Sequence, residues 1–248
     1  MKHYDTNHKA WNQYAGRYQK NADFSFDVVD YGSTHCATEK DLHLIGDASG
    51  KKVLELGCGG ASCGIALAKQ GAEVTGIDIS EEQINIARSN CDRENVQLTL
   101  LVSSMEELDL TDDTYDIVIS MAALGYIEKI ENIFKKVYQT LKKNGIFVFS
   151  LPDAIYNCVT AKYLWNDPLP QHSYFYTGPE KWKWEDEDEL EFVTFRRPIS
   201  EYINLLIDEG FTIVRVHQLQ DFHEEMEGKN EFDLLYPNLI VFKVTKKT

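Results

Sequence analysis

A carboxylate stands on each side of a glycine-rich turn in the segment 53–80, which reads VLELGCGGASCGIALAKQGAEVTGIDIS. Glu55 precedes the turn that holds Gly57 and Gly59, and Asp78 follows about 20 residues after the turn begins. Small residues in such a turn let the backbone approach a bound group closely. A carboxylate at this spacing is suited to hold the two hydroxyl groups of a ribose. The spacing therefore predicts a nucleoside-binding site.

The order of residues at the turn resembles that of a known group of enzymes. The stretch ELGCG, which begins at Glu55, is similar to the acidic, x, Gly, x, Gly pattern at the end of the first strand in class I S-adenosylmethionine (SAM) methyltransferases. A carboxylate there suits the cationic amine and sulfonium of SAM and would repel a diphosphate. Ala61 stands where the family often has a third glycine. The resemblance implies SAM as the cofactor and S-adenosylhomocysteine as its product.

Two other classes of protein are weighed against a methyltransferase. An NAD(P)-dependent oxidoreductase would carry glycine at the first, third and sixth positions of the turn. Counted from Gly57, the sixth position is Ser62, and both Ser62 and Glu55 disfavour a dinucleotide. A non-catalytic SAM-binding protein is the second alternative, because the sequence identifies no general base.

Length and charge limit the range of partners. The chain has 248 residues, enough for one large α/β domain with a lid, and its net charge is −15. Nucleic-acid phosphates need a basic surface, so a small-molecule acceptor is favoured over nucleic acid. No apolar run approaches the roughly 20 residues of a membrane span, and the first residues lack the apolar core of a signal peptide. We expect a cytoplasmic protein without membrane contact.

The cysteines predict neither a metal site nor a disulfide framework. They lie at positions 36, 58, 63, 91 and 158, and none forms a C-x-x-C pair. Their plain interpretation is free thiols in a reducing compartment. We therefore expect no bound metal.

Strand-like and helix-like segments alternate over about 100 residues, which predicts a parallel, doubly wound sheet. Two further strands near the C-terminus are joined without a clear helix, which predicts an antiparallel hairpin at the sheet edge. The expected fold is thus a seven-stranded, mostly parallel, Rossmann-like α/β sheet with an antiparallel C-terminal hairpin. The expected strands are 53–56, 73–77, 96–102, 115–120, 146–151, 211–217 and 239–244, and the expected core helices are 62–70, 81–90, 130–141 and 199–209.

Two segments lie outside this alternating pattern. Residues 1–50 form an expected helical lid before the SAM-binding domain at 51–248, with a two-turn helix that contains Leu42, Leu44 and Ile45 and ends near Gly46. Residues 152–194 are an expected insertion, partly helical near 156–165, with an acidic run at 185–191. The insertion lines an acceptor pocket or forms a second small core. Its aromatic and histidine residues are Tyr156, Trp165, His172, Tyr174, Phe175, Tyr176, Trp182 and Trp184.

The resemblance extends from about residue 51 to 151, and more weakly to 245, and is to small-molecule methyltransferases of the ubiquinone and menaquinone ("type 11"-like) group. It implies that Asp78 holds the ribose, Ile79 lies on the adenine face, and Ser103 to Glu106 surround the adenine edge. Ser120 is expected to face the methionine moiety. The complete set of expected cofactor-binding residues is Tyr18, Tyr31, Glu55, Gly57, Gly59, Asp78, Ile79, Gln83, Ser104, Met105, Glu106 and Ser120.

Aromatic residues of the N-terminal segment have the spacing of one helix face. Trp11, Tyr14 and Tyr18 share that face. In similar enzymes an aromatic ring beside the sulfonium contributes a cation–π contact of roughly 0.5–2 kcal/mol. We expect Tyr18 and Tyr31 to contact the cofactor and Trp11 and Tyr14 to pack the helix onto the core.

The expected reaction is methyl transfer from SAM to a small, apolar or aromatic acceptor at oxygen, nitrogen or carbon. A hydroxyl acceptor must lose its proton. His35 follows the turn at Tyr31, and His172 lies in the aromatic insertion, so these two histidines are the candidates for that role. A surface or packing role is the alternative for both.

Overall fold

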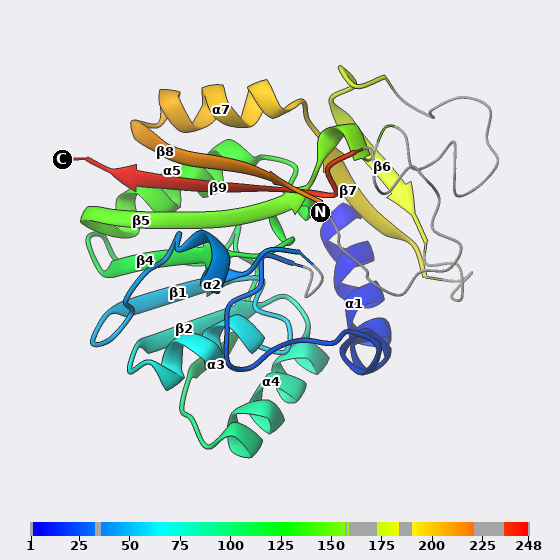
Figure 1. Cartoon of the computed structure of the whole chain (residues 1–248). Helices are drawn as coiled ribbons and strands as arrows, with labels where there is room; N and C mark the ends of the chain where they lie inside the picture. Colours follow the sequence, from blue (N-terminus) through cyan, green and yellow to red (C-terminus); the bar gives the residue numbers. More distant parts are fainter. Residues whose placement is uncertain are drawn as a thin grey trace.

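A computed structural model describes residues 2–32, 36–156, 158, 173–183, 190–220 and 236–247. Its centre is a seven-stranded sheet of order β3-β2-β1-β4-β5-β9-β8 (Figure 1). The first five strands along the chain run parallel, whereas β9 is antiparallel to both β5 and β8. This order confirms the expected Rossmann-like sheet with a C-terminal antiparallel hairpin. The strands are β1 (Lys52–Leu56), β2 (Glu73–Asp78), β3 (Thr99–Val102), β4 (Tyr115–Ser120), β5 (Leu141–Pro152), β8 (Phe211–Leu219) and β9 (Leu239–Lys246).

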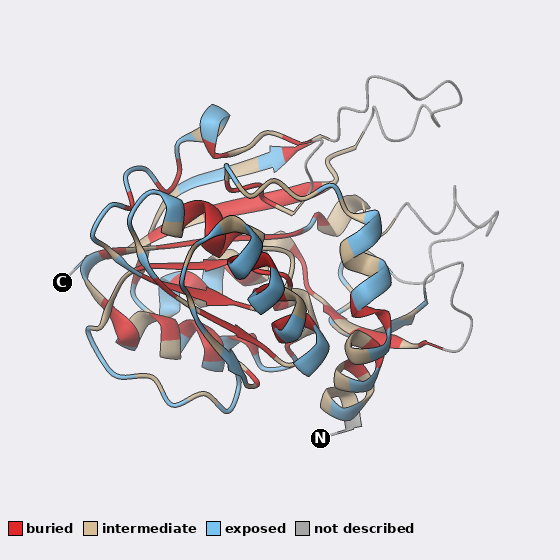
Figure 2. Ribbon diagram, turned by 90° about the horizontal axis from the view of Figure 1, so that it is seen from below, coloured by how far each residue is buried: buried red, intermediate tan, exposed pale blue. Residues whose placement is uncertain are grey.

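Helices cover both faces of the sheet because alternate strand residues point to opposite sides. Leu54 packs with α5 (Ile130–Thr140) and α7 (Ile199–Asp208) on one face. Val53 packs with α3 (Ser62–Lys69) on the other face, where α4 (Glu81–Glu94) also lies. Figure 2 shows the inner strands of the sheet as buried and the outer helix surfaces as exposed. The strands are therefore apolar on both sides, as is typical of parallel sheets.

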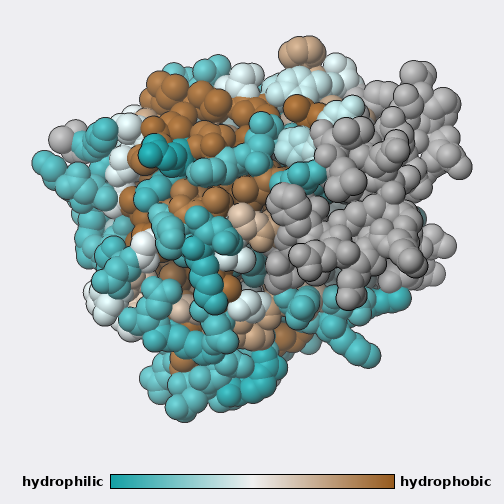
Figure 3. Space-filling view, in the orientation of Figure 1, coloured by the Kyte–Doolittle hydropathy of each residue, from teal (hydrophilic) through white to brown (hydrophobic). Residues whose placement is uncertain are grey.

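One edge of the sheet carries hydrophobic side chains at the surface. In Figure 3 these side chains gather around β8 and β9, whereas hydrophilic ones cover the side of α3 and α4. Val216 of the edge strand β8 is 39% exposed. The site described below lies away from this edge, at the carboxyl ends of the parallel strands.

The short helix of the N-terminal segment is a correction to the sequence expectation. α2 spans only Glu39–Leu42, so Leu44 and Ile45 follow the helix instead of belonging to it. The Glu39 carboxylate accepts hydrogen bonds from the backbone N–H groups of Leu44 and Ile45, both at 2.9 Å. His43 ends the helix with φ of 50°. The buried carboxylate thus replaces the second helical turn, and both apolar side chains still reach the core.

Two boundaries in the core differ from the prediction. α5 ends at Thr140 and β5 begins at once at Leu141 instead of residue 146, so Asn144 lies inside the strand with φ of 62°. Leu141 already pairs with Tyr115 of β4, followed by a register shift. β3 begins at Thr99 instead of residue 96 because its pairing with β2 begins there, opposite Thr75.

The expected insertion contains a hairpin that the sequence did not indicate. β6 (Gly178–Trp182) and β7 (Phe192–Arg196) form a separate antiparallel pair. This hairpin packs against α1 (Lys2–Asn21), and Figure 1 shows both at the same end of the sheet. Residues 154–156 are helical. Cys158 is helical as well, whereas residue 157, residues 159–165 and most of the acidic run lie outside the described residues, as do His172 and Trp184.

Candidate functional site

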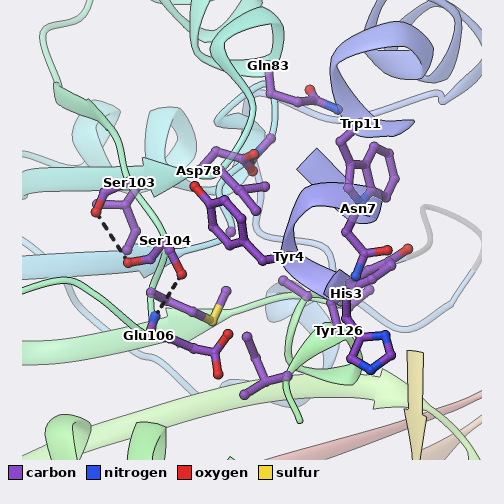
Figure 4. A pocket seen from close by; sticks show the side chains of 18 of the residues that line it. His3, Tyr4, Asn7, Trp11, Asp78, Gln83, Ser103, Ser104, Glu106 and Tyr126 are labelled. Atoms are coloured by element: carbon purple, nitrogen blue, oxygen red, sulfur yellow. Dashed lines mark hydrogen bonds between the residues drawn. The ribbon is translucent and has the colours of Figure 1, made fainter. Parts of the chain in front are cut away.

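A cavity opens at the carboxyl ends of β1, β2 and β4, where the strand order reverses direction along the chain. Doubly wound sheets bind their ligands at this point. Figure 4 shows the side chains that α1 and the strand ends direct into it. The described lining consists of His3, Tyr4, Asn7, Trp11, Tyr18, Gly57, Gly59, Ile77, Asp78, Ile79, Gln83, Ser103, Ser104, Met105, Glu106, Met121, Ala122, Ala123, Tyr126, Ile127, Glu128 and Phe195.

The glycine turn forms the floor of the cavity. Gly57 has φ of +69°, and a Cβ at this position would lie 2.4 Å from the Cβ of Ala123. Gly59 has φ of +52°. Both positions are therefore strained for any larger residue. The turn brings backbone N–H and C=O groups to the cavity where a side chain would otherwise close it.

Asp78 is clamped at the tip of β2. Its Oδ2 accepts from the Gly59 N–H at 2.9 Å and its Oδ1 accepts from the Ser80 N–H at 2.9 Å. The carboxyl is 9% exposed, and burial raises its pKa. Each carboxylate oxygen accepts more than one hydrogen bond. The clamp thus fixes Asp78 and leaves acceptor capacity for the two hydroxyl groups of a ribose.

The next turn past Asp78 ties the start of α4 to α1. Ser80 caps α4 by accepting from the Gln83 N–H at 3.1 Å, and its hydroxyl donates to Asn12 of α1 at 2.7 Å. The Gln83 side chain, which lines the cavity, accepts from the Gln19 amide at 2.9 Å. These contacts hold α1 across the glycine turn.

The far end of the cavity is formed by the loop after β3. The Ser104 hydroxyl accepts from the Glu106 N–H at 3.1 Å, as the dashed line in Figure 4 marks. This bond fixes the loop and leaves the hydroxyl proton free to donate. Ile79 and Met105 supply apolar surface on either side. Figure 4 places the Tyr4 ring of α1 between Asp78 and Ser104, so one aromatic face also borders this end.

Glu55 does not line the cavity but lies beneath the turn. It is 3% exposed, and a Cβ at Gly64 of α3 would lie 2.5 Å from its Oε2. That oxygen has no hydrogen-bond partner in the described structure. Burial raises the pKa of Glu55 to about 8. Glu55 therefore acts on the cavity through the shape of the turn, because its raised pKa favours the uncharged form.

Ser120 and Tyr31 need correction as contact residues. Ser120 is fully buried and its hydroxyl donates to the Leu56 carbonyl at 2.9 Å, so it joins β4 to β1 beneath the cavity. Tyr31 is fully buried as well, and its hydroxyl donates to the Glu39 carboxylate. Burial raises the pKa of Tyr31 well above its usual range. Neither side chain belongs to the cavity lining.

Aromatic side chains of α1 have two roles. Tyr14 is 4% exposed and packs on Phe192 with ring centroids 6.1 Å apart. Trp11, expected only to pack, also lines the cavity, edge-on to Tyr18 at 5.2 Å and to Tyr126 at 5.8 Å. Tyr18 lines the cavity as expected of a contact residue.

Sequence reasoning missed the first turns of α1 and the residue Phe195. His3, Tyr4 and Asn7 line the cavity, and the His3 ring lies edge-on to Phe195 at 5.3 Å. The available signal was helical spacing, since Tyr4, Asn7 and Trp11 continue the face of Tyr14 and Tyr18 toward the N-terminus. The candidate bases His35 and His172 lie outside the described residues.

The sheet order, the glycine turn and the clamped aspartate together define a class I SAM-dependent methyltransferase. The model of a family described as "Methyltransferase domain" matches residues 47–189, more than half of the chain. The chain belongs to this family. It is an enzyme that uses SAM, and the oxidoreductase alternative is excluded.

Individual relatives agree with this assignment. A Geobacillus sp. (strain WCH70) protein named as a methyltransferase is 28% identical, over 79% of this chain and 87% of the relative. A ubiquinone biosynthesis O-methyltransferase of Rickettsia canadensis (strain McKiel) is 26% identical, over 83% of each chain. The solved structure of a SAM-dependent methyltransferase from Listeria monocytogenes has a TM-score of 0.72 and 25% identity, over 84% of this chain and 96% of that one.

A further neighbour shares the fold. The methyltransferase of Haloferax volcanii, solved in complex with the Trm112 activator, has a TM-score of 0.70, 17% identity and 97% coverage of each chain.

Two further features are absent from the described residues. No helix among them is long and apolar enough to cross a bilayer. Nor do the same residues bring three His, Cys, Asp or Glu side chains into a group that could hold a metal ion.

Proposed function

We propose that this enzyme transfers the SAM methyl group to a small, apolar or aromatic acceptor that enters between α1, the turn at Leu124–Tyr126 and β7. The observation that carries this proposal is the lining at that end of the cavity. It is formed by Trp11, Tyr126, Ile127 and Phe195, and no Lys or Arg belongs to the described lining. Anionic acceptors would lack a counter-charge there, whereas apolar rings find aromatic partners.

The cofactor fits the opposite end of the cavity. We expect Asp78 to hold the ribose, Ile79 and Met105 to enclose the adenine, and the backbone of Gly57 and Gly59 to support the amino-acid part. Tyr18 places an aromatic ring at the same end. When bound, SAM supplies an electrophilic methyl group on a cationic sulfur. The chain's contribution is to orient the acceptor in line and to exclude water.

The N-terminal segment then acts as the lid of the site. α1 lies across the glycine turn through the bonds of Asn12 and Gln19. Because Tyr4, Trp11 and Tyr18 all reach the cavity from this helix, its displacement would open the cofactor end and the acceptor end together. This role belongs to α1, whereas Tyr31, Leu44 and Ile45 pack into the core with β1, so the expected lid at 1–50 reduces to the helix Lys2–Asn21 in this proposal.

Oxygen is the methylated atom that a relative supports, since one relative is named as a ubiquinone biosynthesis O-methyltransferase. A hydroxyl acceptor must give up a proton. His3 lines the cavity, and it is the only histidine in the described lining. We assign the proton-accepting role to His3, in place of the two histidines expected from the sequence.

A matched acceptor panel tests the proposal. Formation of S-adenosylhomocysteine is measured with uncharged phenols and with the same rings carrying a carboxylate or phosphate. We expect at least tenfold higher kcat/KM for the uncharged member of each pair. A consistent preference for the anionic member would contradict the acceptor class. His3→Ala should lower kcat with the phenol acceptors, whereas the exposed His43→Ala should leave it unchanged.

The surface charge supports a small molecule over nucleic acid as the acceptor. A net charge of −15 opposes binding to a phosphate backbone. Action in the cytoplasm is consistent with this acceptor class. A protein partner is open to test, because the Haloferax volcanii neighbour was solved with an activator protein.

A further inference from the structure

Asp30 is a buried carboxyl that the cofactor assignment does not use. It lies between α1 and α2 and is 2% exposed. Its Oδ1 accepts from the Gly32 N–H at 3.0 Å, which forms a turn. Its Oδ2 is buried and has no hydrogen-bond partner within the described structure. An unpartnered carboxyl oxygen in the interior is costly, so its retention indicates a partner that arrives with a ligand.

Asp30 lies next to the cavity but is not part of its described lining. A Cβ at Gly32 would lie 3.3 Å from the Cβ of Ala122, which belongs to the cavity lining. The Cys63 thiol, just after the glycine turn, donates to the Asp30 carbonyl at 3.5 Å. The charge of Asp30 also contributes to a raised pKa of Tyr18, another lining residue. Asp30 thus lies between the glycine turn and the lining near β4.

A second carboxyl acts on the same turn from below. Glu55 Oε2 is buried without a partner, and the charge of Asp30 adds to the raised pKa of Glu55. Among the described residues, no Lys, Arg or His forms an ion pair with Asp30, Glu55 or Asp78. In the part of the chain that the structure describes, buried carboxyls without a cationic side-chain partner therefore border the turn.

The positions of Asp78 and Ala122 indicate the direction in which SAM would lie across the glycine turn. Asp78 and Ile79 stand at the tip of β2, on one side of the turn, and Ala122 stands past the end of β4, on the other. With the ribose at Asp78, the amino-acid part of SAM would extend across Gly57 toward Ala122. Its α-ammonium would then lie near the segment that carries Asp30.

We propose that Asp30 binds the α-ammonium of the methionine moiety of SAM. The proposal rests on the use of SAM and not on the identity of the acceptor. It makes Asp30 a cofactor-binding residue contributed by the N-terminal segment.

A charge-neutral substitution separates this role from a structural one. Asp30→Asn keeps an oxygen that accepts from the Gly32 N–H and removes the charge. The probes are S-adenosylhomocysteine and its deaminated analogue, which keeps the carboxylate, both measured by calorimetry. We expect Asp30→Asn to weaken the first at least tenfold and to change the second less than twofold. The exposed Asp23→Asn is the matched control and should change neither.

Three results would overturn the proposal. The first is an equal loss for both probes, which would mean that Asp30 only shapes the site. The second is unchanged affinity for S-adenosylhomocysteine in Asp30→Asn. The third is a wild-type enzyme that binds both probes equally. If Asp30→Asn does not fold by circular dichroism, Asp30→Ser serves instead, because its hydroxyl can make the same turn bond. A wild-type enzyme that binds neither probe would question the cofactor site itself, which is a distinct outcome.

Discussion

The side-chain amide of Asn7 pairs with the backbone of Val193 in both directions. Its Nδ2 donates to the Val193 carbonyl and its Oδ1 accepts from the Val193 N–H, each at 2.8 Å. These residues are 186 positions apart and belong to α1 and β7. Because Asn7 also lines the cavity, this pair connects the lid helix, the hairpin of the insertion and the site.

Asn7→Ala is expected to loosen this connection. The substitution leaves one buried backbone donor and one buried backbone acceptor without a partner. The cost of each unpaired group is at most about 1–3 kcal/mol. We expect a free energy of unfolding lower by about 1–3 kcal/mol and a weaker acceptor interaction, seen as a higher acceptor KM. Urea denaturation and steady-state kinetics measure these effects. Asn21→Ala, at the exposed end of α1, should stay within about 0.5 kcal/mol; equal effects of the two variants would contradict the role of the pair.

Asp78→Ala is expected to remove the ribose contacts. Hydrogen bonds to a charged acceptor contribute about 1.5–3 kcal/mol each, and the ribose offers two hydroxyl groups. The affinity for S-adenosylhomocysteine should fall at least 100-fold in calorimetry. Asp92→Ala, at an exposed position of α4, is the control. An unchanged affinity in Asp78→Ala would mean that the ribose is held elsewhere.

The raised pKa of Glu55 predicts that the stability of the ligand-free protein depends on pH. Burial raises the pKa of Glu55 from 4.5 to about 8. The protonated form is thus favoured by folding, so this contribution to stability is fully present below pH 4.5 and is lost as the pH rises through about 8. The slope for one such group is about 1.4 kcal/mol per pH unit.

The test compares wild type with Glu55→Gln. Denaturant unfolding is measured from pH 5 to pH 8.5 without ligand, and the difference in free energy of unfolding between the two proteins is plotted against pH. The variant should lose less stability than wild type as the pH rises. Burial shifts the pKa of Asp30 and Asp78 in the same direction, so a residual slope is expected in the variant. A difference in free energy of unfolding that stays constant from pH 5 to pH 8.5 would contradict the raised pKa of Glu55.

Gly57→Ala is expected to close the floor of the cavity. The new Cβ would lie 2.4 Å from the Cβ of Ala123, at φ of +69°. Backbone strain of this kind costs about 1–3 kcal/mol, and the displaced backbone should also weaken S-adenosylhomocysteine binding. Gly16→Ala is the matched control, because nothing lies within 4 Å of a Cβ there and Ala favours the helix by up to about 1 kcal/mol. Thermal unfolding with and without ligand distinguishes the two; a stable, fully binding Gly57→Ala would contradict the predicted close approach.

The sequence by itself determined the nucleoside half of the site. Glu55, Gly57, Gly59 and Asp78 belong to one contiguous strand–turn–helix–strand unit, whose short connections leave few arrangements. Elements that follow one another in the chain are also neighbours in this fold. Residue spacing was therefore enough to predict the alternation of strands and helices, and with it the sheet. Contacts between this unit and SAM stay predictions that the variants above test.

Only the tertiary structure decided which distant side chains meet this unit. Helical spacing placed Trp11 and Tyr18 on one face, but the docking of α1 decided that Tyr4 and Asn7 reach the cavity as well. Tyr31 is equally aromatic, yet the buried carboxylate of Glu39 holds it in the core. The strand β7 (Phe192–Arg196) pairs through Val193 with Asn7, 186 positions away in the chain. Local propensity carries no information on such contacts, because their energy depends on burial and partners that exist only after the chain has folded.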